Sequence, residues 1–110
     1  MNCIFCDIIA GAIPCKKAYE DDLVLAFFDI APAAPVHILV VPKEHIDGAA
    51  AITADNADIV AHIFSVIPKI AAEQGLTAFR VVTNNGEDAG QSVFHLHFHL
   101  LGGRTMKSMG

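Results

Sequence analysis

The sequence predicts an α+β domain, a mostly antiparallel five-stranded sheet with one long helix and a short N-terminal helix. Five short segments of the 110-residue chain are rich in apolar and β-branched residues, with turn-forming Gly, Pro, Asn and Asp between several of them. One stretch instead repeats apolar residues at spacings of three and four, the periodicity of one helical face. A single domain over residues 1–110 accommodates these elements.

Five strands are predicted from the apolar and β-branched segments. They cover residues 18–20, 23–29, 37–42, 79–84 and 93–101. The second and third, LVLAFFD and HILVVP, are joined by APAAP, which reads as a tight connection. Pro42 is expected to end the third strand, because it has no N–H to donate to a ladder.

The long helix is predicted over residues 53–74. Its apolar face consists of Val60, Ile63, Phe64, Ile67, Ile70 and Ala71. Thr53 is the expected N-cap, and Gly75 follows as the C-terminal stop. The short helix is expected near residues 6–10.

Composition excludes several classes of partner. The chain is 54% hydrophobic, but no apolar run reaches the ~18 residues of a membrane span, so no membrane partner is expected. The net charge is −5 and the longest basic cluster is Lys16 and Lys17, which argues against nucleic acid. Three cysteines and an N-terminus unlike a signal peptide favour a cytoplasmic protein. So many apolar residues in a short chain predict a homodimer.

Three histidines alternate with apolar residues near the C-terminus. They are His95, His97 and His99. In an extended strand they would share one face at about 6.6 Å intervals. The opposite face is expected to be core and consists of Phe94, Leu96, Phe98 and Leu100. Because imidazoles titrate near pH 7 and are poor filler, the row indicates a chemical site.

Two kinds of chemistry fit this row. A His-x-His pair on a strand can hold a catalytic zinc together with a third protein ligand and a water. A neutral imidazole can instead attack phosphorus when an acceptor holds its second nitrogen. The loop at residues 84–92, NNGEDAGQS, favours the second because its amide, hydroxyl and backbone N–H groups suit a phosphate. An ordinary hairpin connection explains its glycines equally well.

The segment GQSVFHLHFHLLGGR resembles the signature of the histidine triad (HIT) family, in which three histidines alternate with apolar residues. The blocks IFCDIIAGAIP, YEDDLVLAFFDI, APVHILVVPKEHI and NNGEDAGQSV stand in the family's order, so the resemblance covers nearly the whole chain. It points to the branch of histidine triad nucleotide-binding proteins, of bacterial type. The resemblance implies dimerisation through the long helix and an edge strand, which extends the sheet across the dimer.

Proteins of this branch hydrolyse purine nucleoside 5′-phosphoramidates, releasing a nucleoside monophosphate from an amine through a nucleotidyl-histidine intermediate. By resemblance His97 is the nucleophile, while His99 contacts the phosphate and helps the leaving group. His37 would support these imidazoles from the neighbouring strand, and Ser92 would serve the leaving group. The resemblance implies no cofactor for catalysis.

The same resemblance implies a site for a purine nucleotide such as AMP or GMP. Asp29 is expected to accept hydrogen bonds from the ribose hydroxyls, with Ile30 beside it. The base would lie in an apolar slot made of Phe5, Ile8, Ile13 and Phe27. The phosphate would be held by Asn84, Gly90, Gln91, Ser92, His97 and His99.

Cys3 and Cys6 form a C-x-x-C pair, which is a common half-site for zinc. Some bacterial proteins that the chain resembles complete such a site with the histidine of a PK-x-HI segment and the first triad histidine, here His45 and His95. This implies a structural zinc, separate from the chemistry at His97. Two small buried thiols without metal are the other interpretation.

Three functions remain open on the sequence alone. The first is the phosphoramidate hydrolase. The second is a dinucleoside polyphosphate hydrolase, which would use the same nucleophile on a phosphoanhydride. The third is a nucleotide-binding regulatory module whose hydrolysis is incidental, because binding and slow turnover would use the same residues.

Overall fold

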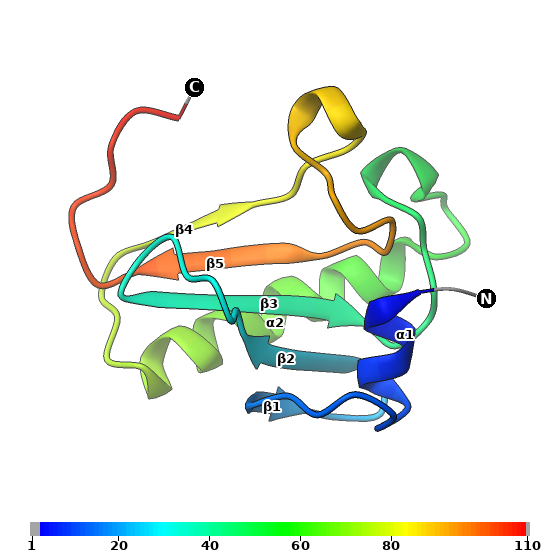
Figure 1. Cartoon of the computed structure of the whole chain (residues 1–110), viewed down its shortest axis with the longest axis horizontal. Helices are drawn as coiled ribbons and strands as arrows, with labels where there is room; N and C mark the ends of the chain where they lie inside the picture. Colours follow the sequence, from blue (N-terminus) through cyan, green and yellow to red (C-terminus); the bar gives the residue numbers. More distant parts are fainter. Residues whose placement is uncertain (1–2, 110) are drawn as a thin grey trace.

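The α+β class is confirmed in a computed structural model, which describes residues 3–109 (Figure 1). Its helices are α1 (Ile4–Ile9) and α2 (Ala57–Glu73), and single 3₁₀ turns lie at Ala49–Ala51 and Glu87–Ala89. Its strands are β1 (Lys17–Glu20), β2 (Val24–Phe28), β3 (Val36–Pro42), β4 (Phe79–Val82) and β5 (Phe98–Gly102). The strand order is β1-β2-β3-β5-β4, and every neighbouring pair is antiparallel.

The two faces of the sheet are covered differently. α2 lies along one face, behind the sheet in Figure 1, and packs on a core that includes Val40, Leu96 and Leu100. The other face carries the short α1 and a smaller core around Phe5 and Phe27. Because α1 has only six residues, it covers only part of this second face, and a cavity lies beside it.

α2 begins later than its periodicity predicts. Thr53 was expected to cap it, but the helix starts at Ala57, and Thr53 instead opens a separate turn. Asn56 Oδ1 accepts the Thr53 N–H at 2.7 Å, and the Ala57 N–H donates to the Thr53 carbonyl at 2.9 Å. The predicted stop is confirmed, since the helix ends at Glu73 and Gly75 adopts a φ of +73°. No helix within residues 3–109 combines the length and hydropathy needed to cross a membrane.

β5 is shorter than predicted, so the three histidines do not lie in one regular strand. The pairing of β3 with β5 begins at Val40 and Phe98, and residues 93–97 leave the ladder. The reason is a competing partner far along the chain, since the Leu96 N–H donates to the Ile46 carbonyl at 2.6 Å instead of to β3. The core face is confirmed for Leu96, Phe98 and Leu100, but Phe94 is 48% exposed and was wrongly placed there.

Candidate active site

A cavity of about 480 Å³ opens on the α1 face of the sheet. Residues from α1, the segment after it, β2, β3 and the histidine row line it together. The residues predicted for the nucleotide that do so are Phe5, Ile8, Ile13, Phe27, Asp29, Ile30, Ser92, His97 and His99. The cavity therefore joins an apolar slot, a carboxylate and two imidazoles in one continuous space.

His97 presents a single nitrogen to this cavity. Its Nδ1 lies 2.7 Å from the His95 carbonyl oxygen, and a carbonyl only accepts, so Nδ1 carries the proton in the neutral ring. Nε2 is then left with a lone pair, as a nucleophile requires. The ring is 6% exposed and packs edge-on against Phe5, with centroids 5.1 Å apart. The Thr83 hydroxyl donates to the His97 carbonyl at 2.7 Å and holds the backbone behind the ring.

His99 has the opposite proton arrangement, which a chain of hydrogen bonds determines. The Ala33 N–H donates to His37 Nδ1 at 2.9 Å, so the proton of the neutral His37 ring lies on Nε2. That Nε2 lies 2.9 Å from His99 Nδ1 and donates to it. His99 Nδ1 is therefore an acceptor, and its proton sits on Nε2 as a donor. Register explains the contact, since Leu39 of β3 pairs with His99 and His37 lies two residues away on the same face.

Burial keeps this pair of histidines neutral. Desolvation, together with the neighbouring His97 and His37, lowers the pKa of His99 to about 4, and the Asp29 carboxylate partly opposes this shift. Burial also lowers the pKa of His37, while the Asp29 carboxylate opposes that shift. Both rings are therefore uncharged at neutral pH, which is the state in which the hydrogen-bond chain assigns their protons.

Asp29 lies at the end of β2 with one oxygen already engaged. Its Oδ1 accepts the Ala31 N–H at 2.8 Å, which orients the carboxylate. Its Oδ2 lies 3.5 Å from His37 Nε2, but that proton points to His99 at the shorter distance. Oδ2 therefore keeps accepting capacity on the cavity side, which suits vicinal hydroxyl groups.

Gln91 was expected at the phosphate, but its side chain is fully engaged in joining loops. It is 5% exposed, its Oε1 accepts the Gly86 N–H at 2.8 Å, and its Nε2 donates to the carbonyls of Asp47 and Val93 at 2.8 and 3.1 Å. It does not line the cavity. The other predicted nucleotide residues outside the lining are Asn84 and Gly90. Any contact of Gln91 with phosphate would have to come from its backbone.

Several groups that build the site were missed from the sequence. The Ala33 N–H and the His95 carbonyl orient the rings of His37 and His97, and the Thr83 hydroxyl holds the His97 backbone. Two of these three groups belong to the backbone and have no side-chain signature. The cavity also has walls that were not predicted. They are Ile4, Pro14, Cys15, Lys16, Phe28, Leu39 and Val93. Lys16 lies two residues after Pro14, and its Nζ is 4.7 Å from the Phe28 ring centre, a cation–π contact that no local pattern marks.

A second cluster of titratable groups lies beside the first. It consists of Cys3, Cys6, His45 and His95, whose ligand atoms all lie within 4.8 Å of one another. Cys3 and Cys6 Sγ lie 3.4 and 3.6 Å from His95 Nδ1, and Cys6 Sγ lies 3.3 Å from His45 Nδ1. Two sulfurs and two imidazole nitrogens form the donor set of a tetrahedral structural zinc site.

The far nitrogens of both histidines are held so that Nδ1 faces the thiols. His95 Nε2 donates to the Pro42 carbonyl at 2.8 Å, and His45 Nε2 donates to the Asp47 carboxylate at 2.9 Å. Such outer partners orient metal-ligating histidines. Burial and the neighbouring Cys3 raise the pKa of the Cys6 thiol to about 11, so metal binding would release its proton. These residues fit a bound zinc.

Comparison with known proteins agrees with this site. Residues 10–106 match the model of the HIT domain family, so the chain belongs to that family. It is 50% identical over 104 residues to an uncharacterized HIT-like protein of Synechococcus elongatus, covering 94% of this chain and 91% of that protein. A histidine triad protein from Clostridium difficile is 54% identical with a TM-score of 0.95, covering 100% of this chain and 97% of the other. A HIT family hydrolase from Clostridium thermocellum is 47% identical with a TM-score of 0.95, covering 98% and 96%.

Proposed function

We propose that this chain, as one HIT domain over residues 1–110, hydrolyses purine nucleoside 5′-phosphoramidates through a nucleotidyl-histidine intermediate on His97. The observation that carries the proposal is that the neighbouring rings of His97 and His99 are held in opposite neutral tautomers. His97 offers a lone pair on Nε2 and His99 offers a proton on Nε2, both within one cavity. A nucleophile beside a donor for phosphoryl oxygen is what transfer at phosphorus needs.

In the first step His97 Nε2 forms a bond to phosphorus while the P–N bond breaks. The electron pair of that bond goes to the leaving nitrogen, which takes a proton relayed from water through the Ser92 hydroxyl. The positive charge on the modified ring is stabilised by the His95 carbonyl at Nδ1. His99, held by His37, donates from Nε2 to the phosphoryl oxygens.

In the second step water attacks phosphorus and the P–Nε2 bond breaks. The electron pair returns to His97, the proton of the attacking water goes to solvent, and a nucleoside monophosphate is released. One proton is taken up in the first step and one is released in the second. The apolar slot around Phe5 and Phe27 would bind the base, and Asp29 would accept from the ribose hydroxyls of AMP or GMP.

The site also bears on the other functions. A catalytic zinc held by a His-x-His pair is disfavoured, because His97 belongs to neither group of potential metal ligands found within residues 3–109. A dinucleoside polyphosphate hydrolase would use the same atoms, and Ser92 at the rim favours a leaving nitrogen that needs a proton. A regulatory module would bind the nucleotide and turn it over too slowly to matter.

Quenching in alkaline denaturant tests the proposal directly, because the P–N bond of a phosphorylated imidazole survives base but hydrolyses in acid. Wild-type protein mixed with an adenosine phosphoramidate and quenched within the first turnovers should carry one added AMP by intact mass, mapped to the peptide that contains His97. His97→Gly should carry none while still binding AMP in a calorimetric titration. Fast turnover by the wild type with no adduct, or an equal adduct on the variant, would contradict the covalent route.

We further propose that Cys3, Cys6, His45 and His95 hold a structural zinc and that two chains form a homodimer. The dimer would form through α2 and an edge strand, as the family resemblance implies. β4 lies at the edge of the sheet, and its Phe79 is 42% exposed and so available to a second chain. A zinc at the cluster would tie α1 to the loop after β3 and contribute to folding without entering the reaction. The cytoplasmic setting, in which such thiols stay reduced, also stays a prediction.

A further inference from the structure

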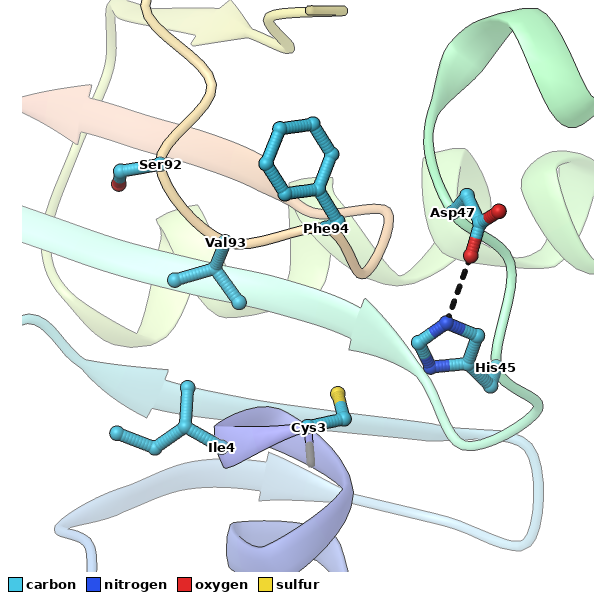
Figure 2. Close-up of a pocket in the computed structure, with 7 residues that line it drawn as sticks. All are labelled: Cys3, Ile4, His45, Asp47, Ser92, Val93 and Phe94. Carbon is cyan, nitrogen blue, oxygen red and sulfur yellow. Dashed lines mark hydrogen bonds and ion pairs between the residues drawn. The ribbon is translucent and has the colours of Figure 1, made fainter. Parts of the chain in front are cut away.

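A second cavity, of about 510 Å³, adjoins the nucleotide cavity. Ile4, Ser92 and Val93 line both, so the two cavities meet at these residues. Figure 2 shows Ser92 and Val93 on one side of the second cavity and Asp47 with His45 on the opposite side. A group attached to phosphorus near Ser92 can therefore extend through this space toward Asp47.

The walls of this cavity combine apolar surface with one negative end. Phe94 and Ile4 are 48% and 49% exposed and line the same cavity, so together they present apolar surface to it. Asp47 Oδ1 accepts from His45 at 2.9 Å, and within residues 3–109 no hydrogen bond or ion pair is recorded for its Oδ2. The part of the lining that the described residues provide includes no lysine or arginine. This surface complements an apolar body that carries a positive charge at its far end.

The order of the reaction determines what can occupy this space. In-line displacement sends the leaving nitrogen away from the attacking Nε2 of His97. Ser92, which proton delivery to that nitrogen requires, stands where the two cavities meet. The base and ribose would occupy the first cavity, so the second is left for the substituent on the amine.

We propose that the second cavity is the leaving-group subsite and that it selects amines whose apolar substituent ends in a positive charge. The proposal rests on phosphoramidate hydrolysis and adds the class of amine to it. Phe94 and Ile4 provide apolar contact, and the Asp47 carboxylate distinguishes a charged end from a neutral one. Nucleotide binding alone would leave this cavity without a use.

Three adenosine 5′-phosphoramidates of primary amines test the subsite. One carries an ethyl group, the second a long arylalkyl group ending in an ammonium, and the third the same arylalkyl group ending in a hydroxyl. The nitrogen bonded to phosphorus is matched, so differences report on the substituent. Wild-type kcat/KM should be about tenfold higher for the ammonium substrate than for the ethyl one, from burial of the aryl group, with the hydroxyl substrate between them.

Two variants separate the two parts of the subsite. Phe94→Ala should abolish the preference of both long substrates over the ethyl one. Asp47→Asn keeps an acceptor oxygen for His45 and should remove only the difference between ammonium and hydroxyl ends. Leu23→Ala and Asp55→Asn, exposed residues outside both cavities, are the matched controls. Metal content is measured for every protein, so that a change at His45 is recognised.

The outcomes distinguish the subsite from the function on which it rests. If the wild type hydrolyses the ethyl substrate and Phe94→Ala keeps the full preference for long substrates, the subsite is overturned and the hydrolase stands. If Asp47→Asn leaves the ammonium preference intact, the charge selection is overturned. If the wild type binds AMP and hydrolyses none of the three, both proposals fail.

Discussion

The histidines near the C-terminus divide into two groups that expose different ring nitrogens. His95 and its neighbour His45 turn Nδ1 toward two thiols, because the Pro42 carbonyl and the Asp47 carboxylate hold their Nε2 protons. His97 and His99 turn Nε2 toward a cavity, because their Nδ1 atoms face inward. The nitrogen that each imidazole presents therefore follows from the partner of its other nitrogen, more than from its place in the row.

The largest expected effect comes from removing the nucleophile. His97→Gly should lower turnover of an adenosine phosphoramidate by at least about 10³-fold, because the covalent step has no substitute. Bound zinc should stay at the wild-type level, since His97 lies outside the thiol cluster. Release of the amine measured in single turnovers, with metal analysis of the same samples, checks both. If His97→Gly kept turnover within tenfold of wild type, His97 would not be the nucleophile.

The reverse experiment removes a thiol from the other group. Cys6→Ser should lower zinc affinity by more than about 100-fold, because a hydroxyl is a poor substitute for a thiolate ligand. The thermal midpoint should fall while turnover at low temperature falls less than tenfold. Cys15→Ser, which lies outside the cluster, is the control and should bind zinc normally. A chelator-free preparation with less than about 0.2 zinc per wild-type chain would contradict the metal assignment.

Breaking the hydrogen-bond chain behind His99 should have an intermediate effect. His37→Leu removes the donor to His99 Nδ1, so the proton of His99 is no longer confined to Nε2. We expect kcat to fall about 10- to 100-fold with KM changed little, because His37 orients the His99 ring without touching the substrate. His37→Gln, whose amide can still donate, should recover part of the loss. Equal activity of the two variants would show that the donated hydrogen bond is unimportant.

The smallest expected effect is on the pH dependence of stability. The pKa of His99 is about 4 in the folded chain and near 6.5 when exposed, so between these values the unfolded chain binds more protons. The free energy of unfolding should therefore fall as pH drops from about 6.5 to 4, by about 1 to 2 kcal/mol from this residue, and should not change further below 4 on its account. Urea unfolding of wild type and His99→Gln across this range measures the difference. Parallel curves for the two proteins would contradict it.

Much of the fold follows from patterns that act over a few residues. The strand from Ile38 to Val41 is buried as predicted, and so is most of the helix face, including Ile63, Ile67 and Ile70. Phe64 was predicted on the same face but is 49% exposed. The beginning of α2 and of β5 was misjudged because partners distant along the chain or in the next turn decide it, as the Ile46 carbonyl does for Leu96. Periodicity predicts which face of a helix or strand is buried. Where the element begins depends on which of the competing hydrogen-bond partners its backbone groups bind.

From the sequence alone came the order of elements, the row of histidines and the C-x-x-C pair, because each of these depends on side-chain type and short spacing. The apolar slot around Phe5 and Phe27 was implied only by the family resemblance, because its members are far apart along the chain. The family resemblance had already predicted how His95, His97 and His99 divide between thiols and cavity, but the tertiary structure was needed to show which ring nitrogen each of them presents. Their protons are placed by groups such as the Pro42 carbonyl, 53 residues from His95, and the Ala33 N–H behind His37. Backbone groups have no sequence signature, so folding alone brings them to the rings that they orient.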